Sequence, residues 1–374
     1  MLYFLRLGSL GFGGPIALAG YMQRDLVEDR QWITKEEYVQ GLALAQLAPG
    51  PLAAQLAIYL GWVRGGVLGA NLVSVAFILP SFLMVVALAV LYIRFGGLPW
   101  MQGAFYGVGA AVIAIIARSA YKLTRTTLAR DWLLWTLFAV SAAVTAWTES
   151  EIVWLFLFSG LVAFVVRGKL SARGLASLSL GSVPVWLVTG LGGPASAGAL
   201  SAIFLYFAEA GAFVFGSGLA IVPFLYGGVV GQFHWLTERQ FLDAVAVAMI
   251  TPGPVVITVG FIGYLVAGLG GAVAAALGVF LPCYLLVVLP APYYRRFANN
   301  PKIKAFISGV TAAATGAIAG AAFVLGKRAI IDIPTGLIAL VTLAILLKTR
   351  KVPEPIVIIA AGVAGLLLRQ FHTV

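Results

Sequence analysis

Gln46-Leu-Ala-Pro-Gly-Pro-Leu52 interrupts a long apolar stretch, and Met249-Ile-Thr-Pro-Gly-Pro-Val255 repeats the interruption 203 residues later. Proline removes a backbone donor and disfavours a helical conformation for the residue before it, so a helix that arrives at Pro49 ends there. Proline also suits the first position of a helix, so Pro51 can begin the next one. Each Pro-Gly-Pro therefore predicts a pair of helices that meet at a break.

The sequence on both sides of this motif keeps the same register, which predicts a duplicated unit. The matching pairs are Phe12-Gly13 with Phe215-Gly216, Trp32-Ile-Thr34 with Trp235-Leu-Thr237, Leu79-Pro80 with Leu281-Pro282, and Gly107-Val108 with Gly309-Val310. A one-residue gap after the motif changes the offset from 203 to 202. We predict a first repeat over 1–130, a connecting hairpin and one further span over 131–200, a second repeat over 201–328, and a C-terminal hairpin over 329–374.

The composition places the chain in a lipid bilayer. Of its 374 residues 61% are hydrophobic and 10% are charged, whereas soluble domains carry about 25% charged residues. Several of its apolar segments reach the roughly 20 residues that a spanning helix needs. We predict an all-α polytopic membrane protein with about 12–13 transmembrane helices, broken at glycine and proline, in two homologous halves.

The basic residues indicate an inner-membrane protein with its two halves inverted. The formal net charge is +11, which fits positively charged cytoplasmic loops better than nucleic-acid binding. In the first half the charge follows the fourth segment, and in the second half it precedes the fourth segment. The residues are Arg118, Lys122, Arg125 and Arg130 in the first half, and Arg295, Arg296, Lys302 and Lys304 in the second. An inverted repeat also requires the segment 175–193 to cross the membrane.

Four breaks, two in each half, are the candidate substrate site. The free amides at a helix N-terminus and the helix dipole favour an anion. The same residues would also serve as hinges or close-packing positions, and that alternative stays open. The candidates are Gly13, Gly14 and Pro15; Pro49, Gly50 and Pro51; Gly216, Ser217 and Gly218; and Pro252, Gly253 and Pro254.

Three polar side chains complete the candidate site. Arg6 and Glu209 are repeat partners within apolar segments, where a charge costs roughly 2.5–3.5 kcal/mol on insertion scales. Alternatively, Arg6 extends to the membrane surface, or the two form an ion pair. Gln55 follows the first Pro-Gly-Pro and can donate to an anion or bond to a neighbouring helix. We interpret Glu238 and Asp243 as charges at a helix start.

No motif for a nucleotide, a metal or covalent catalysis is found, so we expect neither an enzyme nor a cofactor. The sequence lacks the Gly-x-x-x-x-Gly-Lys-Ser/Thr loop. His234 and His372 are far apart, and Cys283 is the single cysteine.

These motifs together resemble the chromate transporter family in its long, two-domain form. The first half carries Phe4-Leu-Arg-Leu-Gly8, Leu47-Ala-Pro-Gly-Pro51 and Leu79-Pro-Ser-Phe82, and the second half carries Thr251-Pro-Gly-Pro254, Phe280-Leu-Pro-Cys283 and Gly309-Val-Thr-Ala-Ala313. This sequence departs from a perfect repeat at Ser217, which stands where the first half has Gly14, and it has no second-half match for Pro15.

The resemblance implies chromate resistance through efflux of chromate, with sulfate as a related anion, by an inner-membrane carrier. The membrane potential or antiport with protons would drive the export. The implied partners are a chromate-like or sulfate-like oxyanion and the lipid bilayer, without nucleic acid, and a homodimer is one allowed assembly. A carrier for another anion or a small organic solute, and a channel-like protein, are the alternatives.

Overall fold

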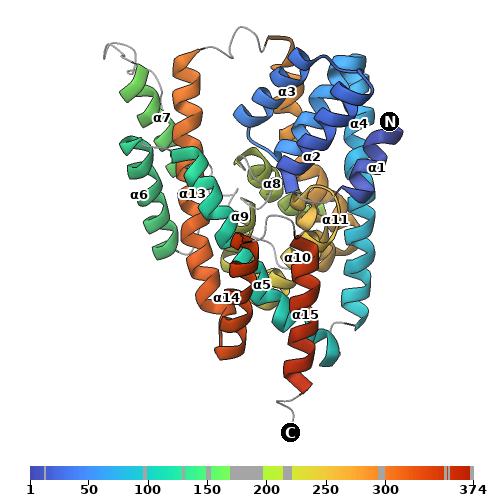
Figure 1. The fold of residues 1–374 in the computed structure, drawn as a ribbon, viewed down its shortest axis with the longest axis vertical. Coiled ribbons are helices and arrows are strands. Elements are labelled where there is room, and N and C mark those ends of the chain that lie inside the picture. The colour runs from blue at the N-terminus through green and yellow to red at the C-terminus, as the bar shows by residue number, and fades with distance from the viewer. Residues whose placement is uncertain are drawn as a thin grey trace.

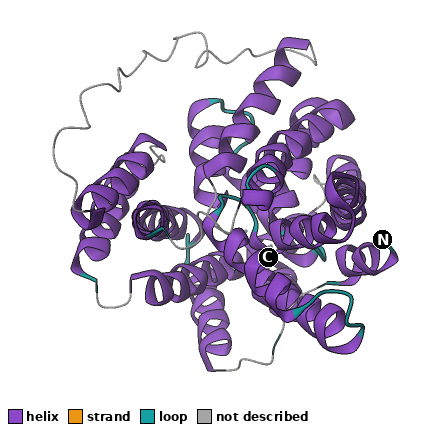
Figure 2. Ribbon diagram, turned by 90° about the horizontal axis from the view of Figure 1, so that it is seen from above, coloured by secondary structure: helices purple, strands orange, loops and turns teal. Residues whose placement is uncertain are grey.

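A computed structural model describes residues 1–11, 14–95, 99–128, 131–148, 153–168, 197–213, 221–293, 300–348, 352 and 354–370. Every regular element in these ranges is helical (Figure 2). The predicted span over 175–193 lies outside them. The all-α fold class is confirmed.

The first half contains seven α-helices and one π-helical turn in this described part of the chain. They are α1 (Leu2–Leu10), α2 (Gly14–Met22), the π-helical turn Gln23–Asp29, α3 (Lys35–Leu47), α4 (Leu52–Phe95), α5 (Pro99–Leu128), α6 (Trp132–Thr148) and α7 (Val153–Gly168).

The second half has the same order of long helices. It contains α8 (Ala197–Phe213), α9 (Ile221–Tyr226), the π-helical turn Gly227–Gln232, α10 (Glu238–Ile250), the 3₁₀ turn Val255–Ile257, α11 (Thr258–Val288), the 3₁₀ turn Ala291–Tyr293, α13 (Pro301–Ala329), α14 (Ile333–Lys348) and α15 (Glu354–Gln370).

The backbone repeats between the halves in detail. Gln31 and His234, which are 203 residues apart, both have φ of 51°. Both α3 and α10 begin with a capping box, since Thr34 and Thr237 each exchange hydrogen bonds with the residue three positions later. The long helices α4 and α11 each reverse direction at a glycine with positive φ, Gly66 and Gly268. The duplication predicted from sequence therefore extends to local conformation.

Both Pro-Gly-Pro motifs lie at the tips of helical hairpins. The helices α3 and α4 lie antiparallel, because a Cβ on Gly41 would overlap the ring of Tyr59 on the other side of the motif. The chain then turns back again at Gly65–Gly66, where a Cβ on Gly61 would lie 2.6 Å from the Gly69 carbonyl oxygen. The apolar stretch over 38–62 is thus folded back on itself.

This turn divides α4 into a short first limb, 52–64, and a long second limb, 67–95. We call 49–51 the first tip and 252–254 the second tip. The first tip lies about 22 Å along its hairpin from Gly65, at about 1.5 Å per residue. It therefore reaches about as deep as the middle of the second limb.

The two C-terminal hairpins are exchanged between the halves. The helices α6 and α7 follow α5 in the chain but pack on α13 of the second half, while α14 and α15 pack on α5 (Figure 1). Glycines allow these close approaches: a Cβ on Gly309 would overlap the Ser159 carbonyl oxygen, and one on Gly107 would overlap that of Ala361. Each half is therefore completed by the other.

Four helical stretches in the described part of the chain are long and apolar enough to cross a bilayer: Leu52–Phe95, Trp100–Arg125, Val255–Tyr293 and Pro301–Lys327. Five shorter apolar helices accompany them. Large apolar side chains such as Leu68, Ile333 and Leu340 are more than three-fifths exposed on the outer faces of α4 and α14. Lipid is the solvent that suits such faces, so this is a multi-pass membrane protein.

Candidate functional site

The first tip packs against the part of α11 that follows its turn at Gly268, in the other half. Gly50 has φ of +137° and is buried. A Cβ at this position would lie 2.9 Å from the Cys283 Sγ. Cys283 follows Pro282 on α11, and its thiol lies 3.5 Å from the Gly211 carbonyl oxygen of α8. Glycine is therefore required at this tip, because φ is positive and because there is no room for a Cβ.

The second tip makes the equivalent contact with the first half. Gly253 has φ of +101°, and a Cβ there would overlap the Ser81 Oγ. Ser81 is the repeat partner of Cys283, and its hydroxyl donates to the Gly8 carbonyl oxygen at 3.0 Å. The Gly253 amide donates to the carbonyl oxygen of Gly11, at the end of α1, at 3.0 Å. The two tips thus cross between the halves in the same way.

The hydrogen bonding of the two tips differs. At the second tip the Gly253 amide is used, and the Thr258 hydroxyl donates to the Val255 carbonyl oxygen at 2.7 Å. At the first tip, no acceptor within the described residues bonds to the amides of Gly50, Leu52 or Ala53. At the second tip the amides of Val255 and Val256 likewise have no acceptor among the described residues, and position 214, which corresponds to Gly11, lies outside them. Each tip therefore offers donors at a helix N-terminus.

Gln55 stands at this first tip, in the first turn of α4. It is fully buried, and its Nε2 donates to the Pro49 carbonyl oxygen at 2.5 Å. Its Oε1 is buried without a partner in the described part of the fold. The sequence predicted that Gln55 would donate to an anion or to a helix. The structure directs one of its N–H groups to the backbone of the tip, so Gln55 shapes the loop that presents the amides.

The hairpins approach opposite ends of the second limb of α4. The first hairpin turns at Gly65–Gly66, at the start of that limb. The second hairpin contacts it at Ser81 through Gly253, and again at Tyr92, whose hydroxyl donates to Asp243 Oδ2 at 2.7 Å. Asp243 lies ten residues before Gly253, so the second hairpin begins near the end of α4 that is remote from Gly65.

The first glycine break is present, and part of its partner is outside the described residues. α1 ends at Leu10, and α2 begins at Gly14 with Pro15 in its first turn, as predicted. Gly13 falls outside the described ranges, and so do Gly216, Ser217 and Gly218.

The charged pair lies apart from the tips. Arg6 and Glu209 are exposed on α1 and α8, whereas the buried face of α1 carries Phe4, Leu7 and Gly8. No ion pair within the described chain joins Arg6 to Glu209. The structure therefore places the first tip near α11 and α8 and the second tip near α4 and α1, and leaves these two charges on outer faces.

Comparison with known families identifies this architecture. The sequence profile of the chromate transporter family matches residues 1–164 and again residues 201–366. The chain belongs to the chromate transporter family. Each match takes in one repeat together with the C-terminal hairpin that follows it, so the repeat unit of the family contains the exchanged hairpin.

Three relatives show how the family varies in length. The chromate transport protein of Cupriavidus metallidurans is 62% identical over 98% of this chain and 92% of its own length. The probable chromate transport protein of Synechococcus elongatus is 59% identical over 98% and 94%. The uncharacterized transporter YwrB of Bacillus subtilis is 28% identical, and the match covers 45% of this chain but 88% of YwrB. No solved structure matches the chain.

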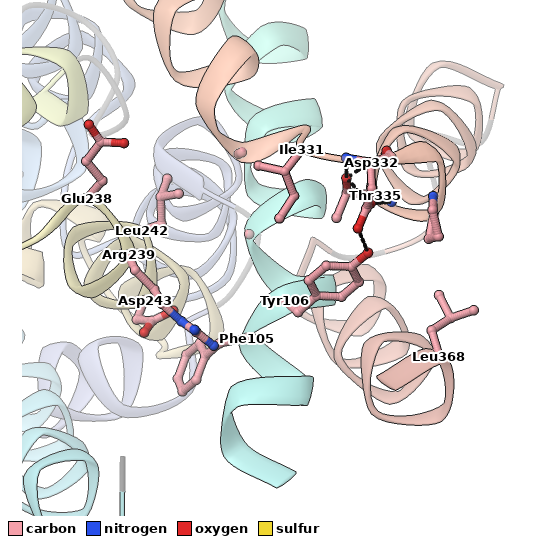
Figure 3. Close-up of a pocket in the computed structure, with 13 residues that line it drawn as sticks. Phe105, Tyr106, Glu238, Arg239, Leu242, Asp243, Ile331, Asp332, Thr335 and Leu368 are labelled. Carbon is pink, nitrogen blue, oxygen red and sulfur yellow. Dashed lines mark hydrogen bonds between the residues drawn. The ribbon is translucent and has the colours of Figure 1, made fainter. Parts of the chain in front are cut away.

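A second polar site was missed by the sequence reasoning. A cavity of about 470 Å³ lies between α5, α10, α14 and α15 (Figure 3). Its lining includes Tyr106, Glu238, Arg239, Asp243 and Asp332. Glu238 is in the first turn of α10, as predicted, but Asp243 is in the second turn and only 5% exposed. The helix-start interpretation of Asp243 is therefore wrong.

Proposed function

We propose that the protein exports chromate across the inner membrane by alternating access, with the amides of the first tip as the anion-binding donors. The observation that carries this proposal is a buried glutamine, Gln55, beside a helix N-terminus in a family named for chromate; the second tip has Thr258 at the equivalent position. Backbone amides bind tetrahedral oxyanions without a metal.

This site would recognise the tetrahedral shape and charge of an oxyanion, and not the central atom that distinguishes one oxyanion from another. Chromate and sulfate are both tetrahedral dianions, and amides recognise the oxygen atoms that they share. The same donors would bind both, so we expect sulfate to compete with chromate. The pseudo-symmetric second tip would act as a structural counterpart, since its amide is bonded to Gly11.

The arrangement of the hairpins supports an inverted repeat. Two hairpins that approach α4 from opposite ends would present their tips to opposite sides of the membrane in turn. Transporters with inverted repeats bind substrate where discontinuous helices of the two repeats meet. A carrier of this kind exposes the tip first to one side and then to the other.

The direction of transport follows from the charge of the substrate. One elementary charge that crosses 100 mV gains about 2.3 kcal/mol. A dianion that leaves a negative cytoplasm gains about twice that, or roughly 4.6 kcal/mol. The membrane potential alone therefore favours export, and proton entry would add to it.

Labelled chromate uptake into everted membrane vesicles tests the proposal. An inside-positive potential should drive uptake that excess sulfate inhibits. Pro49→Ala should reduce uptake more than Pro252→Ala at equal insertion, because Gln55 bonds to the Pro49 carbonyl oxygen and the second tip has no glutamine at the equivalent position. Arg6→Ala tests the contribution of the exposed charge. Well-inserted protein that takes up no chromate would refute the substrate, and equal effects of the two proline variants would refute the assignment to the first tip.

A further inference from the structure

We propose that Asp243 binds the proton that is exchanged for the anion, and that the cavity beside it supplies water. This inference rests on the proposed export of chromate and adds the coupling site to it. Carboxylates within the membrane that face a water-filled cavity are recurrent proton carriers in pumps and transporters.

The cavity surrounds Asp243 with few groups that could neutralise it. Arg239 lies one turn earlier on α10, and its Nη2 donates to the Gln102 carbonyl oxygen at 3.2 Å. Tyr106 of α5 donates to Asp332, which precedes α14, and Glu238 also lines the cavity (Figure 3). Within the described residues no cation lies within 4 Å of the Asp243 carboxylate.

The other carboxylates in the cavity stand at helix starts, whereas Asp243 does not. Asp332 caps α14, because its Oδ1 accepts the Thr335 amide at 2.9 Å. Glu238 is in the first turn of α10, where the helix dipole stabilises a negative charge. The repeat partner of Asp243 is Gln40, an uncharged residue that bonds to Glu36 within α3. The buried carboxylate is thus a feature of one half only.

Tyr92 can accommodate both protonation states of Asp243. Its hydroxyl donates to the ionised carboxylate at 2.7 Å. When the carboxyl group is protonated, the phenol oxygen can accept its hydrogen. The hydrogen bond between the halves therefore persists in both states with its polarity reversed, while the local charge changes by one.

The position of Asp243 connects this charge to the second tip. It lies seven residues before the end of α10, about 10 Å at about 1.5 Å per residue, and the tip follows directly. Tyr92 lies eleven residues after Ser81 on α4, and Ser81 contacts Gly253. The pairs Tyr92–Asp243 and Ser81–Gly253 join α4 to the second hairpin at two points, so a shift at one pair moves the other.

The test uses purified full-length protein in liposomes and separates exchange from coupling. Exchange of chromate for labelled chromate without any gradient requires binding and alternating access only. Uptake driven by a pH gradient, with the potential clamped at zero by potassium and valinomycin, requires a coupled proton. A pH-sensitive dye reports the proton movement directly.

Asp243→Asn should retain exchange and lose both pH-driven uptake and the dye response. Asp332→Asn is the matched control, since asparagine caps a helix equally well, and it should retain all three. Tyr92→Phe, which keeps the carboxylate, should move the pH of half-maximal uptake, and Asp332→Asn should not.

In the variants, three outcomes would overturn the inference: coupled proton movement in Asp243→Asn, loss of exchange in folded Asp243→Asn, or an unchanged pH profile in Tyr92→Phe. Wild type that exchanges chromate without moving protons would leave the proposed export intact and refute the coupling site. Wild type without chromate exchange would refute the proposed function itself.

Discussion

Gly253→Ala adds one methyl group to the second tip, and its cost can be worked out from two contributions. The backbone contribution arises because φ of +101° is unfavourable for a residue with a side chain, at about 1–3 kcal/mol. The packing contribution arises because the new methyl group overlaps the Ser81 Oγ, and overpacking costs about 1–3 kcal/mol. The expected loss of stability is therefore about 2–6 kcal/mol.

Gly268→Ala isolates the backbone contribution. Gly268 has φ of +62°, but no atom lies within 4 Å of the position that its methyl group would take, so only the conformational cost applies. The two variants should differ by about 1–3 kcal/mol, which is about 5–150-fold in the unfolding equilibrium. Ser81→Ala in the Gly253→Ala background should recover part of that difference, because it removes the overlapping oxygen.

Cys283 provides the assay, because it is the single cysteine of the chain and is fully buried. A thiol-reactive fluorophore therefore reports unfolding in detergent for all of these variants. If Gly253→Ala unfolds no more readily than Gly268→Ala, or if Ser81→Ala gives no recovery, the packing of the second tip on α4 is refuted.

Three further predictions concern the first tip and the exchanged hairpins. Gln55→Leu should abolish chromate uptake at normal insertion, whereas Thr258→Val, which loses only a local bond to Val255, should not; equal losses would contradict the role of the first tip. Gly107→Ala should lower the thermal midpoint, because its methyl group overlaps the Ala361 carbonyl oxygen, while Gly109→Ala, with open space, should not. Gly50→Ala should speed maleimide labelling of Cys283, whose Sγ lies 2.9 Å from the new methyl position, and an unchanged rate would count against this contact.

The sequence predicted those features that depend on local chemistry. The ends of α3 and α10 at Pro-Gly-Pro are encoded within a few residues of each site. The direction of the chain after each break is not determined by the neighbouring residues in the sequence. It depends on the packing of Gly41 against Tyr59, so a break in a straight helix and the tip of a hairpin have the same sequence pattern.

The polar sites also depend on contacts between residues that are far apart in the sequence. Asp243 stands in an apolar helix, and nothing in the neighbouring sequence distinguishes it from Glu238. Its importance depends on Tyr92, which lies 151 residues earlier in the chain. It depends also on the cavity, part of whose lining comes from the exchanged hairpin α14–α15. Likewise, the bond from Gln55 to the Pro49 carbonyl oxygen, which sets Gln55 at the first tip, is not visible in the sequence.

The exchanged hairpins bear on how such a protein is assembled and on how it arose. A chain with one repeat would have its terminal hairpin but no second repeat for that hairpin to pack on, and the groove on its own α5 would face lipid. Two such chains could satisfy each other by trading hairpins, as in a domain-swapped dimer. Fusion of the two genes would then turn a concentration-dependent association into an intramolecular one, and would free each half to specialise, as the carboxylate at Asp243 and the amide at Gln40 illustrate.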